Sequence, residues 1–488
     1  MNQDTLTGGG TGFDLGSFAK GVLLYLLYRK KICFDESEYR KIHLQRDLGI
    51  FTGIWFRFPK LHFLAHFSDD PEMQVAVLGQ ELRVLVDDEE FRGRFDAGKP
   101  TVVFVSYDVA RAGASKVVLE ILKDYAKTHN TVFFSLAGGD RKATFTDCAS
   151  YCVFELGTRG CQKQLQRQLE RVGRVVRPEL AIVNSIGAAE ALVPLAGAGI
   201  PRMQLIHEIA DIEDLRRFET VARFADATVF PANFVRDRAL NVCAGLDASK
   251  CQVLPQGVFE EKDDPEDGGT EGVRSGLLPA SWDDGSIVVL GVGGVNFRKG
   301  VDLFLMCAGL VGGKFPGEKV RFLWVGFGYE SISTEFPAYL RHQLRVTQLA
   351  DVVHFTGELR DLPAAYACAD IFFLPSRLDP LPLVAQQAMD CGLPVVCFDE
   401  AGGIPEFLRA DPVAAGGVVG YLDVPAAAGK IMAFAADPEL RNLVGEAGRR
   451  VARSAFDTET YIESIRSLGR RLCVGGVRRT AEPPPPGR

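Results

Sequence analysis

The sequence predicts an α/β protein with two doubly wound parallel sheets and an extra, mainly helical N-terminal segment. Three observations predict this class. Short apolar runs alternate with helical patterns between residues 101 and 232. A second array of the same kind runs from 286 to 399. Residues 260–286, which lie between the arrays, are acidic and rich in Gly and Pro, as is typical of a surface loop or linker.

These patterns divide the chain into six segments. We expect an N-terminal extension (1–98), a first α/β domain (99–258), an acidic linker (259–285), a second α/β domain (286–455), a C-terminal helix (456–473) and a disordered, Pro-rich tail (474–488).

The N-terminal extension does not follow the strand–helix rhythm of the later segments. Residues 16–66 contain nine Lys or Arg and four acidic residues, so this stretch carries a charge of +5 in an acidic protein. Residues 22–28 are apolar and residues 51–67 are rich in aromatics. Two interpretations stay open: a helical subdomain packed on the first sheet, or a monotopic contact with anionic lipid.

The first array contains six strand patterns and a short turn that holds a candidate glycine. The strands are predicted at 101–107, 131–136, 151–156, 180–185, 202–208 and 227–232, with helices at 116–127 and 211–224 among the connections. Gly113 lies in the first strand–helix turn, and His207 ends the fifth strand. Ligands bind at the carboxyl ends of such strands, so His207 is either a functional residue or an ordinary loop histidine.

The second array begins with a Gly-rich turn that ends in a basic pair. Its strands are predicted at 286–293, 320–328, 352–357, 371–376 and 394–399. Arg298 and Lys299 precede Gly300 between the first strand and its helix. A solvated basic pair is one interpretation. The glycine-rich context favours phosphate binding instead.

Residues 371–406 form the most informative stretch. Ile371–Leu374 and Pro394–Phe398 are typical of buried strands, and a helix is predicted over Leu383–Cys391, with Gly392 as its stop. Asp379 and Gln387 flank the junction between loop and helix. The N–H groups at the start of that helix, near Leu383 and Val384, can bind an anion.

This stretch, PS..DP..LV..QAM..G.PVV....AGG.PE, resembles the Glu-x7-Glu block of the retaining family-four glycosyltransferases, in particular the bacterial cell-surface polysaccharide type. The resemblance implies the GT-B fold, in which two Rossmann-like domains face a cleft and the last helix crosses back to the first domain. The chain departs from the family pattern at three positions. Asp379 and Gln387 stand at the two Glu positions, and Pro382 stands where many members have Gly.

The resemblance also implies a function. The protein would move a sugar from a nucleotide-diphosphate donor to a saccharide or lipid-linked acceptor in polysaccharide or glycan biosynthesis. Arg298 and Lys299 would bind the diphosphate, with the N–H groups of Leu383 and Val384. Asp379 would bind the sugar and Gln387 the ribose.

His207 would complete the catalytic set of His207, Asp379, Arg298 and Lys299, and Gly113 would lie near donor and acceptor. The chain has no D-x-D motif at a strand end, which indicates a site without metal, and no cofactor is expected.

Two rival functions stay open. A catalytically weak GT-B homologue could bind nucleotide-sugar or glycan as an assembly component, as the changes at both Glu positions suggest. A GT-B sugar epimerase would need its own acid–base pair, and the 371–406 stretch fits that poorly.

Composition indicates what the protein does not bind and where in the cell it works. The net charge of −8 argues against nucleic-acid binding. The eleven cysteines are scattered without a C-x-x-C pair, as expected of a reduced cytosolic protein. No signal peptide and no bilayer-length apolar run is evident. We therefore expect a cytoplasmic protein, with peripheral attachment to the inner face of the membrane as the alternative.

Overall fold

The computed structural model describes residues 92–158, 160–258, 277–282, 285–314, 319–331, 335–359 and 362–480. The chain divides into two compact units, Met1–Gly93 and Arg94–Arg488, and the second unit holds both α/β arrays. Most of the predicted N-terminal extension, residues 1–91, lies outside the described residues, as does most of the predicted linker (259–276 and 283–284).

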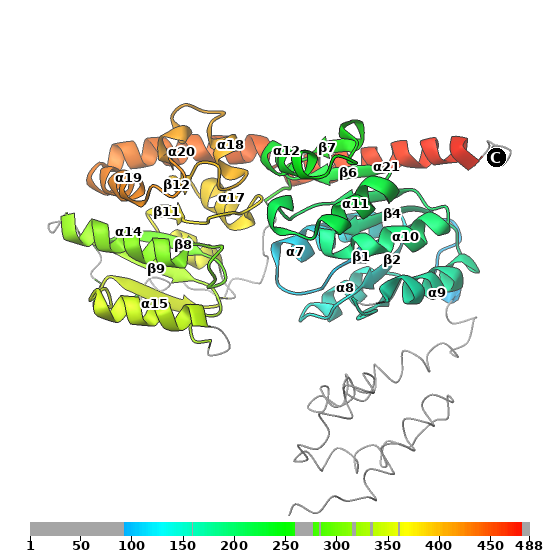
Figure 1. The fold of residues 1–488 in the computed structure, drawn as a ribbon, viewed down its shortest axis with the longest axis horizontal. Coiled ribbons are helices and arrows are strands. Elements are labelled where there is room, and N and C mark those ends of the chain that lie inside the picture. The colour runs from blue at the N-terminus through cyan, green and yellow to red at the C-terminus, as the bar shows by residue number, and fades with distance from the viewer. Residues whose placement is uncertain are drawn as a thin grey trace, which may run out of the picture. The chain divides into compact units, whose positions relative to one another are not determined.

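The first sheet has seven parallel strands in the order β3-β2-β1-β4-β5-β6-β7 (Figure 1). The strands are β1 (Thr101–Ser106), β2 (Asn130–Ser135), β3 (Tyr151–Val153), β4 (Pro178–Asn184), β5 (Arg202–Leu205), β6 (Ala227–Phe230) and β7 (Cys251–Val253). The six predicted strands are confirmed. The seventh strand, β7, was not predicted. The equally short edge strand β3 lies in the longer run YCVFEL (151–156), whereas β7 lies in CQVLPQ (251–256), where glutamines and Pro255 interrupt the apolar pattern.

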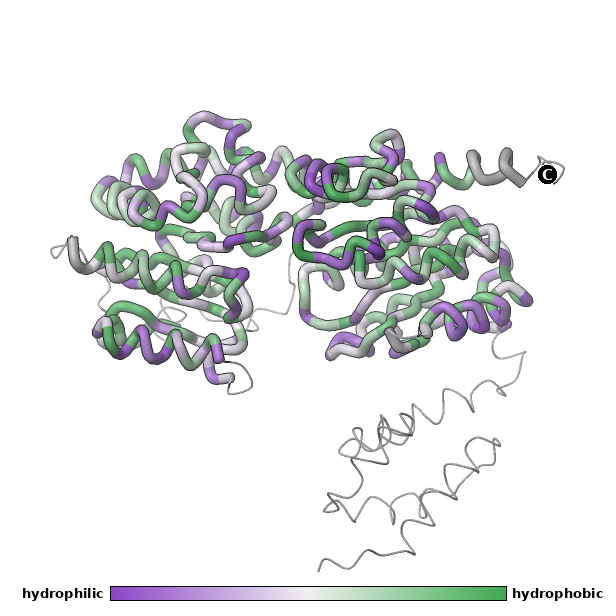
Figure 2. Tube along the Cα trace, viewed as in Figure 1, coloured by the Kyte–Doolittle hydropathy of each residue, from purple (hydrophilic) through white to green (hydrophobic). Residues whose placement is uncertain are grey.

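Helices connect these strands and supply the other half of the core. They are α7 (Gly113–Ala126), α8 (Lys142–Cys148), α9 (Cys161–Gly173), α10 (Leu192–Gly197), α11 (Leu215–Phe224) and α12 (Asn233–Val242), with short 3₁₀ turns at Ile186–Ala191, Ala210–Ile212 and Ala248–Lys250. Figure 2 shows apolar residues concentrated in the strands, whereas α9 is largely hydrophilic. The buried positions of α9 are Cys161, Leu165, Leu169 and Val172, which recur at helical spacing.

The second sheet has six parallel strands in the order β10-β9-β8-β11-β12-β13. They are β8 (Ile287–Val292), β9 (Val320–Val325), β10 (Val353–Gly357), β11 (Ile371–Leu374), β12 (Val395–Phe398) and β13 (Val418–Val419). The helices are α14 (Val301–Lys314), α15 (Glu335–Val346), α16 (Leu362–Ala367), α17 (Leu383–Asp390), α18 (Ile404–Leu408), α19 (Val424–Ala436) and α20 (Pro438–Ala455), with a 3₁₀ turn at Ala414–Gly417.

Both faces of the second sheet are buried. Alternate residues of one strand enter different core clusters: Val289 and Phe373 pack on one side, and Val288 and Phe372 pack on the other. This alternation follows from the two-residue period of a strand and explains why its strands appear as continuous apolar runs in the sequence.

The final helix, α21 (Thr458–Thr480), belongs to the core of the first sheet. Tyr461, Ile465 and Leu468 pack in the cluster that contains Phe104, and the Arg466 guanidinium lies 2.6 Å from the Asp124 carboxylate. The helix is longer than the predicted 456–473. Gly475 and Gly476 lower helix propensity by only about 1 kcal/mol each, and the prolines that forbid a helix begin at Pro483.

Candidate functional site

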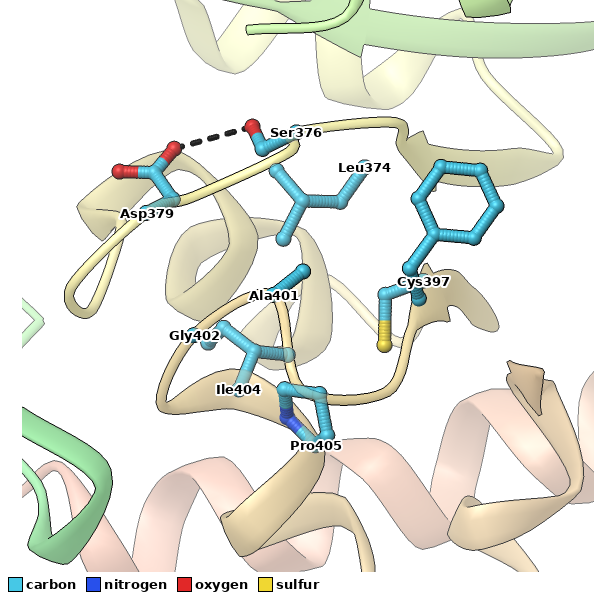
Figure 3. Close-up of a pocket in the computed structure, with 9 residues that line it drawn as sticks. Leu374, Ser376, Asp379, Cys397, Ala401, Gly402, Ile404 and Pro405 are labelled. Carbon is cyan, nitrogen blue, oxygen red and sulfur yellow. Dashed lines mark hydrogen bonds between the residues drawn. The ribbon is translucent and has the colours of Figure 1, made fainter. Parts of the chain in front are cut away.

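The strand order of the second sheet reverses between β8 and β11, and charged side chains meet at this switch point. Lys299 Nζ lies 2.6 Å from Asp379 Oδ2, and Arg298 lies 3.1 Å from Asp379 Oδ1. The Ser376 hydroxyl donates to Asp379 Oδ2 at 3.1 Å, as Figure 3 shows. The structure thus brings together three of the four predicted catalytic residues, at the place where open α/β sheets bind ligands.

Close backbone packing fixes the loops that carry these residues. Gly300 has a φ of 68°, and a Cβ there would lie 1.9 Å from the Pro375 carbonyl oxygen. A Cβ at Gly402 would lie 1.8 Å from the Asp379 carbonyl oxygen, and the Asp379 N–H donates to the Ala401 carbonyl at 2.7 Å. Only glycine fits at these two positions, so the loops after β8, β11 and β12 interlock.

Asp379 is ionised although its surroundings are dry. Burial acts to raise its pKa, but the charges and hydrogen bonds of Lys299 and Arg298 outweigh burial and hold the pKa below its ordinary value. The side chain of Asp379 is only 7% exposed, that of Lys299 14% and that of Arg298 40%. The site is therefore a buried carboxylate that shares its charge between two cations.

A small hollow borders this carboxylate. Its lining includes Asp379, Cys397 and Gly402, and it runs between β12 and the start of α18 (Figure 3). Burial raises the pKa of Cys397 to about 12, so this thiol stays protonated and behaves as an apolar wall.

The N-terminus of α17 lies on the same loop as Asp379. Pro382 is its N-cap, and no side chain caps it. Further along, the Tyr366 hydroxyl lies 3.0 Å from the Val384 carbonyl oxygen and 3.1 Å from Gln387 Oε1. Gln387 is thus a half-buried residue held by hydrogen bonding and not a solvated one.

His207 follows β5 and lies beside the end of β4, one strand away from the switch point of the first sheet, which lies between β1 and β4. Its Nε2 is 2.8 Å from Asn184 Oδ1. Burial lowers the pKa of His207 to about 4, so the ring is neutral near pH 7. The next residue, Glu208, accepts hydrogen bonds from the Ile186 and His207 N–H groups at 3.0 and 2.9 Å and from the Ser185 hydroxyl. Glu208 therefore shapes the loop.

Contacts between the two sheets' loops run close to these residues. Gly113 faces Leu383, where a Cβ would meet the leucine at an ordinary 3.5 Å, so the fold does not require glycine there. Gln256 donates to the Leu381 carbonyl at 2.9 Å. Glu406 accepts from the Asn233 and Phe234 N–H groups at 3.2 and 3.0 Å, which caps the start of α12.

Sequence reasoning missed several of these residues. Asn184 lies one residue before the end of a predicted strand, and Glu406 lies inside the 371–406 stretch. Both residues could be singled out from the sequence, but their hydrogen-bond partners could not. No sequence pattern marks Gln256 or Tyr366 as part of the site, because their contacts depend on how distant elements pack.

No group of three or more His, Cys, Asp or Glu side chains in the described part of the chain could hold a metal ion. No helix formed by the described residues has the length and apolar character needed to cross a membrane.

Comparison with known proteins identifies the second array. Residues 286–437 match the family model "Glycosyl transferases group 1". The chain is 28% identical over 286 residues to the sulfoquinovosyl transferase SQD2 of Arabidopsis thaliana, covering 54% of this chain and 50% of that protein. It is 26% identical over 271 residues to an alpha-maltose-1-phosphate synthase of Mycobacterium tuberculosis, covering 52% of this chain and 66% of that protein. The chain thus spans half to two thirds of the length of these relatives.

The fold is shared with a solved nucleotide-sugar complex. Anabaena Alr3699/HepE, solved with UDP-glucose, superposes with a TM-score of 0.63 at 18% identity, covering 75% of this chain and 98% of that one. At this identity the likeness shows the fold alone. The predicted GT-B architecture and the resemblance to family-four glycosyltransferases are confirmed.

Proposed function

From the match of residues 286–437 to the family model "Glycosyl transferases group 1", we propose that the protein is a retaining glycosyltransferase. It moves a sugar from a nucleotide-diphosphate donor to a saccharide or lipid-linked glycan acceptor. The proposed setting is cell-surface polysaccharide synthesis on the cytoplasmic side of the membrane. The observation that carries the proposal is the meeting of Arg298, Lys299 and Asp379 at the switch point of the family-matched sheet.

The chemistry needs stabilisation of the diphosphate as the bond from sugar to phosphate breaks. Arg298 and Lys299 supply fixed positive charge, and the α17 N-terminus supplies the N–H groups of Leu383 and Val384. Because these donors are in place before the reaction, they stabilise developing negative charge without reorganisation. A metal ion is not required for this role.

When the donor binds, the charged side chains of the site change partners. The diphosphate competes with Asp379 for Lys299 and Arg298, and the displaced carboxylate then accepts hydrogen bonds from the sugar hydroxyls. Gln387 contacts the ribose, and His207 and Gly113 contact the sugar and acceptor from the first sheet. No enzymic nucleophile is assigned, since the leaving group and the attacking hydroxyl occupy one face of the sugar.

A binding protein without turnover is the rival function. The observation that favours it is Gln387, whose amide offers one neutral acceptor where the family has a carboxylate. Such a protein would bind UDP-sugars at the same site and transfer nothing.

The experiment is a turnover assay on purified full-length protein with a panel of nucleotide-sugars that includes UDP-glucose. Lys299→Ala and Arg298→Ala are expected to lower kcat by on the order of 10²–10³, the usual cost of one fixed donor at developing charge.

Arg409→Ala is the matched control, because Arg409 pairs with Asp399 at a half-exposed surface position. Parent-like turnover in both site variants would show that the diphosphate lies elsewhere. Nucleotide binding by the parent without any turnover of the panel would favour the rival.

A further inference from the structure

Helix α9 presents a row of basic side chains to solvent. Lys163, Arg167, Arg171 and Arg174 follow one another at intervals of three or four residues, so they lie on one side of the helix, opposite its buried positions. We call these four residues the α9 basic face. Lys163, Arg167 and Arg174 are exposed, and Arg171 is half-buried with its guanidinium 5.9 Å from the centre of the Tyr151 ring.

The exposed cations of this face lack counter-ions. None of the described residues forms an ion pair with Lys163, Arg167 or Arg174. The only acidic residue of α9, Glu170, accepts a hydrogen bond from the Gln166 amide at 3.1 Å instead. In α20, by contrast, three arginines each lie within 3.3 Å of a carboxylate. The α9 basic face therefore keeps its full positive charge in a chain whose net charge is −8.

This arrangement opposes the formation of the helix that carries it. Lys163 and Arg167, like Arg167 and Arg171, are four residues apart, and like charges at that spacing destabilise a helix. Lys163 also lies in the first turn, which has no acidic residue and where the helix dipole disfavours a cation. Natural sequences retain such local conflicts mainly at functional sites. A ligand of opposite charge is therefore the expected reason for this face.

The side chains of the face fit an anion that also carries hydroxyl groups. Three of its four cations are arginines, whose planar guanidinium binds a carboxylate or phosphate through two hydrogen bonds. Gln164 is exposed three residues before Arg167, and its amide can donate to and accept from a hydroxyl. No large apolar side chain of α9 is exposed, so the face lacks the anchors with which interfacial helices enter a lipid surface.

The α9 basic face begins beside the ligand-binding edge of the first sheet. The Cys161 thiol, at the start of α9, lies 3.8 Å from Glu190 in the 3₁₀ turn Ile186–Ala191, which directly follows the end of β4. Strand β4 borders β1 at the switch point of this sheet, where open α/β sheets bind ligands. The 13 residues of α9 then extend for about 20 Å (Figure 1).

We propose that the α9 basic face binds an acidic glycan, a saccharide chain with uronate units that serves as acceptor. This inference rests on the proposed function and names the acceptor class. The carboxylates of the chain pair with Lys163, Arg167 and Arg174, and the Gln164 amide binds sugar hydroxyls. The end of the chain that receives the sugar lies in the crevice, and the preceding acidic units lie along α9.

The first test compares two saccharides of equal length on the full-length protein without donor. Calorimetry should give a Kd for hexagalacturonate at least about tenfold below that for maltohexaose, and raised salt should reduce the difference. Equal affinity for the acidic and the neutral saccharide would overturn the proposal.

Neutralising the face should weaken this binding without harming the fold. Lys163→Gln/Arg167→Gln/Arg174→Gln should raise the Kd for hexagalacturonate at least about tenfold, while its Tm stays equal to that of the parent or rises, because like charges are removed. Glu170→Gln should lower the Kd by up to about fivefold, the scale of one exposed charge. Parent-like affinity in the triple variant would overturn the proposal.

A second triple variant controls for net charge. Lys127→Gln/Arg450→Gln/Arg453→Gln removes the same three charges from exposed side chains that already pair with a carboxylate. It should bind hexagalacturonate like the parent. An equal loss of affinity in both triple variants would show that only the overall charge matters and would refute a site on α9.

Two further probes distinguish a glycan from other anions. Hexaglutamate has six side-chain carboxylates but no sugar hydroxyls, so it should bind several-fold more weakly than hexagalacturonate, and Gln164→Ala should remove that difference. Equal affinity of the parent for both probes would refute glycan recognition. The neutralised triple variant should float with liposomes of phosphatidylserine and phosphatidylcholine as the parent does, and loss of its flotation would assign the face to a lipid surface and overturn the proposal.

Failure of the proposed function would look different. Binding of hexagalacturonate through α9 by a protein that turns over no donor would reject the enzyme and keep the glycan site. With an acidic acceptor that the parent uses, neutralisation of the face should raise the acceptor KM and leave kcat unchanged, because these contacts are the same before and during the reaction. Transfer with an unchanged acceptor KM would reject this inference and leave the glycosyltransferase proposal standing.

Discussion

Replacing Asp379 with Asn tests the charge arrangement of the site most sharply. The substitution keeps the shape of the side chain and removes its charge, which leaves Lys299, with 14% of its side chain exposed, without a counter-ion. Breaking a fully buried pair costs about 3–5 kcal/mol. Arg298 is 40% exposed and can rehydrate, so we expect the lower part of that range, about 3 kcal/mol. This corresponds to a fall of roughly 6–12 °C in Tm.

The pH dependence of this loss follows from the pKa of Asp379. Because the folded-state pKa lies below the ordinary value, the ionised group stabilises the fold above its unfolded pKa of about 4. The stabilisation is lost as the pH falls through the lower folded pKa. The difference in unfolding free energy between parent and Asp379→Asn should be constant from pH 5 to 8 and shrink below pH 4, as measured by urea titration.

The same variant should bind nucleotide more tightly. With the carboxylate neutralised, Lys299 and Arg298 no longer have to exchange it for phosphate, and a charge-assisted hydrogen bond contributes about 1.5–3 kcal/mol. We therefore expect the Kd for UDP, measured by calorimetry, to fall by at least about tenfold.

Asp302→Asn is the control, since Asp302 pairs with Arg377 at 2.7 and 2.8 Å in a partly buried pair whose side chains are 23% and 17% exposed. It should lose stability and leave the affinity for UDP unchanged. Parent-like stability and parent-like UDP affinity in Asp379→Asn would refute the view that this carboxylate competes with the diphosphate.

Four further outcomes are expected. Gln387→Glu should tighten UDP binding by about tenfold in calorimetry, because a carboxylate accepts ribose hydroxyls with charge assistance, whereas unchanged affinity in both Gln387→Glu and Gln387→Ala would remove Gln387 from the site. Transfer should persist in EDTA if the fixed cations suffice, and abolition that added Mg²⁺ reverses would contradict this. Glu406→Ala should destabilise the protein by about 1 kcal/mol through loss of the α12 cap, as measured by urea unfolding, with the 70%-exposed Glu400 as a near-silent alanine control. Deleting residues 1–98 should abolish salt-sensitive flotation with anionic liposomes, since nearby basic residues each add about 1 kcal/mol at such a surface, and equal recovery of both forms in the unbound fraction would favour a packed subdomain.

The features that depend on local sequence pattern, the strands and the residues at their carboxyl ends, could be predicted. The apolar runs of β1 to β6 and β8 to β12 are long enough to identify, and the rule that ligands gather at strand carboxyl ends placed Arg298, Lys299 and Asp379 in one crevice. The predicted end of α21 was wrong, because two glycines weaken a helix without ending it.

The sequence could not predict contacts that depend on strand order. Asn184 meets His207 only because β4 and β5 are neighbours, and Ser106 joins them because β1 lies beside β4. Gln256 and Leu381 are 125 residues apart, and no pattern within either segment indicates their hydrogen bond. Polar networks of this kind are assembled by the fold, so only the three-dimensional structure shows them.

The interlocked loops limit how a new donor preference could be engineered or evolve. Gly300 packs against the Pro375 carbonyl and Gly402 against the Asp379 carbonyl, so a mutation that displaces one of these loops displaces its partner as well. Directed evolution for another sugar should therefore accumulate changes in side chains around the crevice, while both glycines stay invariant. A library that randomises Gly300 and Gly402 should return almost only glycine among its folded clones.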